Sequence, residues 1–246
     1  MSSTSPDPAH RPLELAPPGA LWGSWGLVGA LVVAHVATAV LYAERARATL
    51  VGALFLERSL RLRVTAGGQY APLVSDGQVW RLVRSVGLHA DGLHLLVNCV
   101  AIAVLGRLLE PWIGPVRLLW WFALSGVGGS IASHLAGLTQ SDGASGGAFG
   151  LLGAMLVLGV RNRHRLDDED RPIVTRWLPG FLVLNLVISV LLPFVDAVGH
   201  VGGLLVGCGL ALFARPERPS RTVTAIEAVG VGLMVGIAIT GPSWPP

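Results

Sequence analysis

The chain alternates between long apolar stretches and short polar connections that carry arginine. An apolar helix needs about 20 residues to cross a bilayer, and several of the stretches reach that length. The pattern therefore predicts an all-α, polytopic membrane helix bundle with seven spans, six in a core and one more at the C-terminus. The expected spans are residues 21–43, 88–109, 116–138, 145–160, 174–194, 199–214 and 222–240.

The segments outside these spans complete the predicted organisation. Residues 1–20 are rich in Pro, Ser and Ala, which predicts a disordered cytoplasmic tail. Residues 21–215 are expected to form the core, and its polar connection 44–87 is expected to be a folded, partly membrane-embedded external loop. Residues 216–246 are expected to supply a linker and the extra C-terminal span.

The composition supports the membrane class and narrows the partners. Of the 246 residues, 52% are hydrophobic and 13% are charged, whereas soluble domains carry about 25% charged residues. The net charge of +3 is small and the arginines are scattered, so a lipid bilayer is expected as partner and nucleic acid is not. Cys99 and Cys208 lie in apolar stretches, and their spacing indicates neither a disulfide framework nor a zinc site.

Arginine placement predicts the orientation of the chain. The connection after Val160 is rich in arginine, whereas the turns 139–144 and 195–198 hold no basic residue. By the positive-inside rule the arginine-rich connections and the N-terminus are cytoplasmic. The connection 44–87 carries seven arginines and conflicts with this rule. We nevertheless place it outside, because the alternation of the other connections leaves little choice.

Three spans that enter from the outside carry polar groups at their N-terminal ends. Polar groups are costly in a bilayer, so these residues are candidates for a functional site. Ser145 would begin a helix, where free backbone N–H groups can stabilise an oxyanion and a base can activate the hydroxyl. The alternative is a serine that caps or packs a helix, which describes most membrane serines. The candidate residues are His89, His94, Asn98, Ser145 and His200.

Small residues favour contact between the serine and histidine helices. Glycines recur at four-residue spacing in the helix expected to begin at Ser145 and in the helix that carries His200. Such spacing lets two helix backbones approach closely. A Ser–His hydrogen bond requires that approach. Phe149, one turn after Ser145, is expected to stack on His200; alternatively, His200 is a structural histidine bonded to a carbonyl. The glycines are Gly146 and Gly150 on one helix and Gly199, Gly203 and Gly207 on the other.

The remaining polar residues have competing interpretations. His94 and Asn98 share a helix face and can donate hydrogen bonds to an oxyanion, or merely bond neighbouring helices. A metal site is disfavoured because no H-E-x-x-H pattern or convergent carboxylate accompanies the histidines. Asp196 is expected to be a loop charge or a helix cap rather than a third catalytic residue. Arg81 is expected to pair with a lipid headgroup or a loop carboxylate.

Four motifs in order resemble the rhomboid family of intramembrane serine proteases. The segment Gly143-Ala144-Ser145-Gly146 with Phe149-Gly150 resembles the nucleophile motif of that family. His89 with His94 and Asn98 resembles the second helix, His200-Val201-Gly202-Gly203 the sixth helix, and Trp80-Arg81 the first external loop. The resemblance spans about residues 21–214 and implies a rhomboid-like six-helix core.

The resemblance also implies roles for individual residues. Ser145 would be the nucleophile and His200 the general base. His94, Asn98 and the backbone N–H of Ser145 would form the oxyanion site, with support from the other motif residues. In that family, tyrosine is common at the position that Phe149 occupies here. The resemblance therefore implies that the ring can still stack on His200 but cannot make the hydrogen bond of a phenol. The supporting residues are Phe149, Gly143, Gly146, His89, Trp80 and Arg81.

The sequence thus predicts an intramembrane serine endopeptidase that cleaves transmembrane helices of membrane-protein substrates near the outer membrane face. It needs no metal or other cofactor. A bacterial plasma membrane is the expected location. The alternatives are a non-proteolytic rhomboid-like protein that binds membrane clients and a small transporter. The transporter interpretation rests on Glu227 near the start of the last span.

Overall fold

The computed structural model describes residues 21–46, 49–56, 58–166, 168, 170–214 and 219–241. The tail predicted for residues 1–20 lies outside them. The long helices are α1 (Trp22–Ala46), α6 (Gly92–Ile113), α7 (Pro115–Leu135), α8 (Ser145–Arg161), α10 (Leu178–Leu191), α11 (Ala197–Phe213) and α12 (Arg221–Thr240). The short helices α9 (Asp170–Pro172) and η5 (Ile173–Trp177), the latter a π-helical turn, lead directly into α10.

The first connection is folded into short elements. They are α2 (Leu50–Phe55), α3 (Leu60–Thr65), β1 (Gln69–Tyr70), α4 (Ala71–Ser75), α5 (Arg81–Arg84) and η3 (Ser85–Gly87). The other short elements are β2 (Gln140–Ser141) and η4 (Arg163–Arg165). β1 pairs antiparallel with β2, so a small sheet joins the first connection to the turn before α8. The otherwise all-helical prediction did not include this sheet.

The helical membrane architecture is confirmed, whereas the number of spans stays a prediction. Five helical segments of the described chain are long and apolar enough to cross a membrane. They are Trp22–Glu44, Gly92–Ile113, Pro115–Leu135, Asp170–Leu191 and Arg221–Thr240. The apolar helices α8 and α11 have 17 residues each. At 1.5 Å per residue such a helix is about 25 Å long, slightly less than the hydrocarbon thickness of a bilayer.

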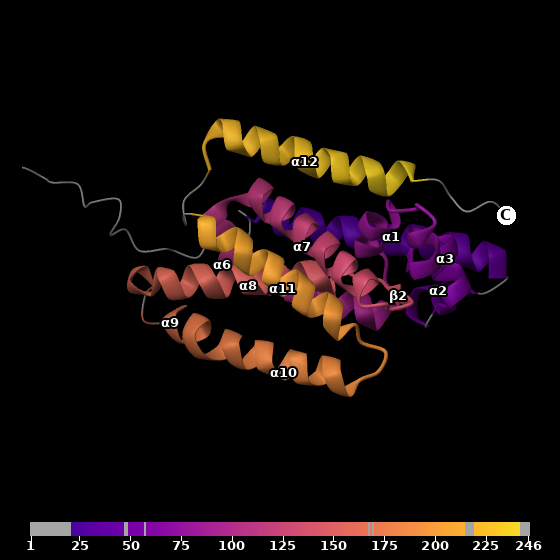
Figure 1. Ribbon diagram of the computed structural model, residues 1–246, viewed down its shortest axis with the longest axis horizontal. Helices are drawn as coiled ribbons and strands as arrows, with labels where there is room; N and C mark the ends of the chain where they lie inside the picture. Colours follow the sequence, from indigo (N-terminus) through magenta and orange to yellow (C-terminus); the bar gives the residue numbers. More distant parts are fainter. Residues whose placement is uncertain are drawn as a thin grey trace, which may run out of the picture.

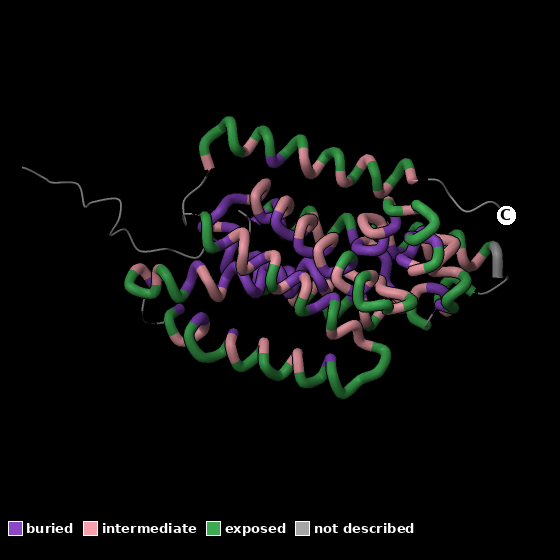
Figure 2. Tube along the Cα trace, in the orientation of Figure 1, coloured by how far each residue is buried: buried purple, intermediate pink, exposed green. Residues whose placement is uncertain are grey.

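Helix α8 lies at the centre of the bundle, packed against α6, α7 and α11 (Figure 1). Helices α10 and α12 lie on opposite sides of this group (Figure 1). Figure 2 shows the buried residues concentrated in the central helices, while α10 and α12 are largely exposed. The buried residues of α10 are Leu178 and Ser189, and that of α12 is Glu227. The exposed faces are apolar, as expected for helices that contact lipid.

Glycines permit the contact between α8 and α11. A Cβ atom on Gly203 would lie 2.0 Å from the carbonyl oxygen of Gly146, and one on Gly207 would lie 1.9 Å from that of Gly150. No side chain fits in such a gap, so the two backbones touch. The close approach predicted from the glycine spacing is therefore present.

Helix α12 is fixed to the bundle by an ion pair. Arg117 Nε of α7 donates to Glu227 Oε1 at 2.8 Å, and both side chains are nearly buried. Gly230 of α12 packs against the ring of Trp120. Glu227, the residue that kept the transporter interpretation open, therefore has a structural partner in this fold.

Candidate active site

Ser145 is the first residue of α8 and follows a sharply shaped turn. Gly143 has a φ of 133°, which glycine adopts far more readily than other residues. The N–H of Gly143 donates to the carbonyl oxygen of Ser85 at 3.0 Å, and the N–H of Ala144 donates to His89 Nε2 at 3.4 Å. The backbone before Ser145 is thus held by the first connection. Ser145 is the first residue of the helix, so its N–H is one of the backbone donors that have no acceptor within the helix.

His200 of α11 lies beside the first turn of α8. Its ring stacks on Phe149 with centroids 4.2 Å apart and an angle of 12° between the planes. Phe149 is four residues after Ser145, and residues at that spacing share a helix face. Ser145 and His200 are therefore neighbours across the α8–α11 contact. Among the described residues no hydrogen bond joins them, and catalytic hydrogen bonds often tighten only when substrate is bound.

The other side of the imidazole has a partner that the sequence analysis missed. His200 Nδ1 lies 2.7 Å from Ser189 Oγ of α10. Ser189 is buried, although its helix is mostly exposed. A polar residue near the end of an apolar span was the available signal. Sequence alone does not show which way that side chain points.

Asp196 caps α11, as the sequence analysis favoured. Its Oδ1 accepts from the N–H of Gly199 at 2.7 Å. Its Oδ2 accepts from Ser141 Oγ at 2.5 Å and also from the hydroxyl of Ser133. The carboxylate therefore joins α7, β2 and α11, and the nearest polar partner of His200 is a different side chain.

His94 and Asn98 approach the same region from α6. A Cβ atom on Gly143 would lie 2.8 Å from His94 Cε1, so the imidazole edge touches the turn that leads to Ser145. Asn98 is buried, and its Nδ2 donates to the His94 carbonyl oxygen at 2.9 Å. An amide nitrogen carries two hydrogens, so one donor remains for another acceptor.

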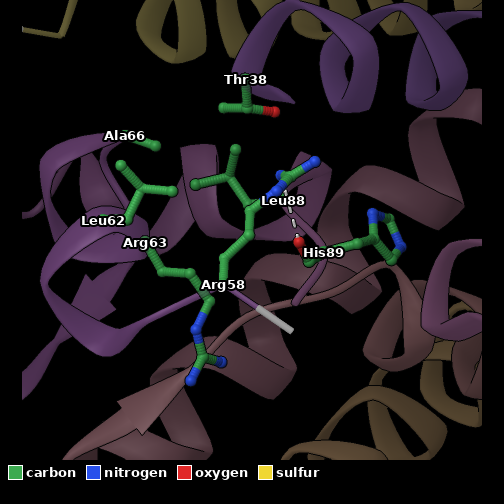
Figure 3. Close-up of a pocket in the computed structure, with 7 residues that line it drawn as sticks. All are labelled: Thr38, Arg58, Leu62, Arg63, Ala66, Leu88 and His89. Carbon is green, nitrogen blue, oxygen red and sulfur yellow. Dashed lines mark hydrogen bonds between the residues drawn. The ribbon is translucent and has the colours of Figure 1, made fainter. Parts of the chain in front are cut away.

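His89 stabilises this corner as a neutral group. It is fully buried and makes an edge contact with His94, with ring centroids 5.1 Å apart. Burial, with a smaller contribution from His94, lowers the pKa of His89 to about 3. The ring therefore stays neutral at pH 7 and can accept from Ala144. Figure 3 shows Arg58 donating to the carbonyl oxygen of His89, at 3.3 Å.

Asp142 connects the first connection to the turn before Ser145. Its fully buried side chain accepts from the N–H of Gln69 at 3.0 Å and from Gln140 Nε2 at 2.5 Å. Arg63 lies 3.8 Å away, a weaker contact. Burial raises the pKa of Asp142 to about 6, against the smaller opposing effects of these partners.

Trp80 and Arg81 belong to the scaffold of the first connection. Arg81 is fully buried, and its Nη1 donates to the carbonyl oxygens of Val64 at 2.7 Å and Gly68 at 2.9 Å. Its guanidinium also lies over the Trp80 ring, 4.6 Å from the centroid. Of the partners expected for Arg81, the loop carboxylate Asp142 interacts with it through charge. The hydrogen bonds of Arg81 go instead to these two carbonyl oxygens and, from Nε, to Gln78 Oε1 at 2.8 Å. No contact joins this pair to Ser145 or His200 within the described part of the chain.

Two further observations concern the surroundings of Ser145: the position of Gly146 and the arrangement of potential metal ligands. Gly146 faces the α11 backbone: a Cβ atom there would lie 3.5 Å from the carbonyl oxygen of Gly199. In the described ranges, no group of three or more His, Cys, Asp or Glu side chains is arranged to hold a metal ion.

Fold and site together define a polytopic helical membrane protein with a serine and a histidine at the adjoining ends of two glycine-packed helices. A family model described as the rhomboid domain matches residues 76–217, more than half of the chain. The chain belongs to the rhomboid family.

Curated relatives agree with this assignment. RHOMBOID-like protein 2 of Arabidopsis thaliana is 34% identical over 233 residues, which cover 83% of this chain and 72% of the relative. RHOMBOID-like protein 5 of the same plant is 39% identical over 150 residues, 59% of this chain and 48% of the relative. The Rhomboid protease GluP of Bacillus subtilis is 34% identical over 144 residues, 58% of this chain and 28% of the relative. The alignments thus span about half of RHOMBOID-like protein 5 and less of GluP.

Proposed function

We propose that this rhomboid-family protein is an intramembrane serine endopeptidase with Ser145 as nucleophile and His200 as general base. The observation that carries the proposal is the stack of His200 on Phe149, which sets the imidazole beside the helix turn that begins at Ser145. The name of GluP, a rhomboid protease, supports the same reaction class.

The chemistry follows from the positions of these groups. His200 takes the proton of Ser145 as the hydroxyl attacks the substrate carbonyl carbon, and it then gives that proton to the leaving amine. The N–H of Ser145, the imidazole of His94 and the free amide hydrogen of Asn98 stabilise the oxyanion. Water then hydrolyses the acyl-enzyme with His200 again as base. No metal or cofactor takes part.

The substrate is a transmembrane helix of another membrane protein. It enters from the lipid beside α10, which contributes only Leu178 and Ser189 to the buried residues of the bundle. The helix must unwind locally, because its peptide bonds are shielded and already hydrogen-bonded. In the orientation given by the arginines, the N-terminus is cytoplasmic and cleavage occurs near the outer face of a plasma membrane, which we expect to be bacterial.

The test is cleavage of a single-span reporter by the reconstituted protein. Ser145→Ala and His200→Ala should each reduce cleavage at least about a thousandfold. Ser59→Ala and His164→Ala change exposed residues away from the site and should cleave like wild type. Wild type should also react covalently with a fluorophosphonate, and Ser145→Ala should not.

Two results would overturn the proposal. One is cleavage by both Ser145→Ala and His200→Ala at the wild-type rate. The other is a folded wild-type protein that binds the reporter but neither cleaves it nor reacts with the fluorophosphonate. That second result would favour the non-proteolytic, client-binding alternative.

A further inference from the structure

One ring nitrogen of His200 is hydrogen-bonded to a residue of a different helix. Ser189 Oγ of α10 lies 2.7 Å from His200 Nδ1. The same hydroxyl donates to the carbonyl oxygen of Asn185, one turn earlier in α10, at 2.6 Å. Two successive hydrogen bonds therefore connect the imidazole of His200, through the hydroxyl of Ser189, to the backbone of α10.

This hydrogen-bonded chain favours one of the two tautomers of the neutral imidazole. A hydroxyl has one hydrogen, and the carbonyl oxygen of Asn185 can only accept. The hydrogen of Ser189 therefore points to Asn185, and Ser189 Oγ accepts a hydrogen bond from Nδ1–H of His200. A neutral imidazole with Nδ1–H has its lone pair on Nε2. That is the form in which Nε2 can take a proton from a serine.

The residues that usually serve this purpose are engaged elsewhere. A carboxylate commonly orients a catalytic histidine, and the nearest candidate in sequence is Asp196. That carboxylate accepts from Gly199, Ser133 and Ser141 and caps α11. Within the described structure, the hydrogen-bond partner of His200 Nδ1 is Ser189 alone.

We infer that Ser189 is a positioning residue, which holds His200 in the Nδ1–H tautomer and fixes its ring against Phe149. The inference rests on the proposed function, because it assumes that His200 is the base. Ser189 is one of the two buried residues of α10, with Leu178, and the polar one of the pair. The seating of α10 against α11 therefore determines whether the base is oriented for proton transfer.

The experiment compares Ser189→Ala with Ser189→Thr, which keeps the hydroxyl, in the reporter assay on the full chain. Loss of one hydrogen bond to a reacting group corresponds to a fall of about tenfold to hundredfold in kcat. We expect that fall for Ser189→Ala with KM changed less than about twofold, and recovery of most of the activity in Ser189→Thr. Asn185→Ala is the matched control, because it removes a side chain bonded only to its own helix and keeps the backbone carbonyl.

A spectroscopic measurement separates positioning from general support of the fold. With ¹⁵N-labelled histidine, His200 in wild type should give one protonated and one unprotonated ring nitrogen, assigned by their loss in His200→Ala. In Ser189→Ala the two resonances should move toward each other as the tautomers mix, while Ser189→Thr keeps them apart.

The outcomes distinguish this inference from the proposed function. Wild-type kcat in Ser189→Ala overturns the inference alone, provided that Ser145→Ala is inactive. Equal loss of kcat in Ser189→Ala and Ser189→Thr with unchanged His200 resonances also overturns it and indicates a packing role. Full activity of Ser145→Ala would overturn the proposed function and this inference together.

Discussion

Ser145 and Asn98 each have a hydrogen-bond donor that is not used within its own helix. Ser145 opens α8, so its N–H is one of the donors that an α-helix cannot satisfy internally. Asn98 donates one amide hydrogen to the carbonyl oxygen of His94, and its second amide hydrogen remains available for another acceptor. The imidazole of His94 contacts the turn formed by Gly143, and Asn98 lies one helical turn after His94 on α6. An anion that forms at Ser145 would thus meet prearranged donors.

The first prediction concerns the oxyanion site. Asn98→Ala should lower kcat by about a hundredfold or more with little change in KM, since the lost hydrogen bond acts mainly in the transition state. Steady-state cleavage of the reporter measures both constants. Asn162→Ala is the control, because Asn162 Nδ2 bonds the carbonyl oxygen four residues earlier in the same way but lies at the far end of α8. An unchanged kcat in Asn98→Ala would remove this residue from the site.

The second prediction concerns Asp142 and pH. Burial raises its pKa from 3.8 to about 6, so the folded protein holds a proton that the unfolded chain releases. This contribution to stability is complete below about pH 3.8 and is lost as the pH rises through about 6, with an upper limit of about 3 kcal/mol. Between pH 4 and about pH 8, wild type should lose thermal stability relative to Asp142→Asn, which cannot ionise. A constant difference in Tm across that range would contradict the prediction.

Between elements, the contact of α8 with α11 decides whether a site exists. The two helices touch through backbone atoms at Gly146 and Gly203, and again at Gly150 and Gly207. This contact aligns Phe149 with the ring of His200. Any side chain added at the contact moves one helix away from the other. This movement also separates Ser145 from His200, the two residues of the proposed dyad.

The third prediction tests this contact. Gly207→Ala should push α8 and α11 apart, because its Cβ would lie 1.9 Å from the carbonyl oxygen of Gly150. We expect a loss of about 1–3 kcal/mol in stability and a larger fractional loss of cleavage. Gly209→Ala on the same helix meets nothing within 4 Å and should be neutral or slightly stabilising. Thermal unfolding in micelles and reporter cleavage measure the two effects; equal behaviour of the two variants would refute the packing argument.

At the scale of the whole molecule, one end of the bundle holds the proposed site together with the first connection, which itself carries seven arginines. The other end holds the arginine-rich connection that follows α8. The small sheet of β1 and β2, the cap of α11 and the start of α8 all meet at the site end. Helix α12 runs along the outside of the bundle, fixed by the ion pair of Arg117 with Glu227 (Figure 1). The connections other than the first predict that the site end faces the outside of the cell.

The fourth prediction tests that orientation. Thr139 lies in the turn at the site end and His164 lies beyond α8 at the opposite end, and both are exposed. On intact cells, a membrane-impermeant maleimide should label Thr139→Cys and leave His164→Cys unlabelled until the membrane is opened. Wild type, whose cysteines lie within α6 and α11, is the control. The reverse labelling pattern would show that the site end faces the cytoplasm.

Parts of this molecule were predictable because they depend on neighbours in sequence. The apolar spans follow from local hydropathy, and the ends of α8 and α12 were placed within one residue. The start of α6 was placed four residues too early, at Leu88 instead of Gly92. The side chain of Asp91 caps this helix by accepting from the N–H of His94 at 2.8 Å, and a cap is invisible to a hydropathy average.

The sequence by itself determined the membrane class, the approximate spans and the motifs, since each depends on residue type and short-range spacing. It also indicated the α8–α11 contact, because glycines repeated on one helix face have few other uses in a bilayer. Only the tertiary structure decided that Ser189 meets His200, that Asp196 also accepts from Ser133 and Ser141, and that Arg81 binds loop carbonyls. Each of these contacts depends on how a helix or loop is rotated against distant neighbours, and packing of the whole bundle sets that rotation.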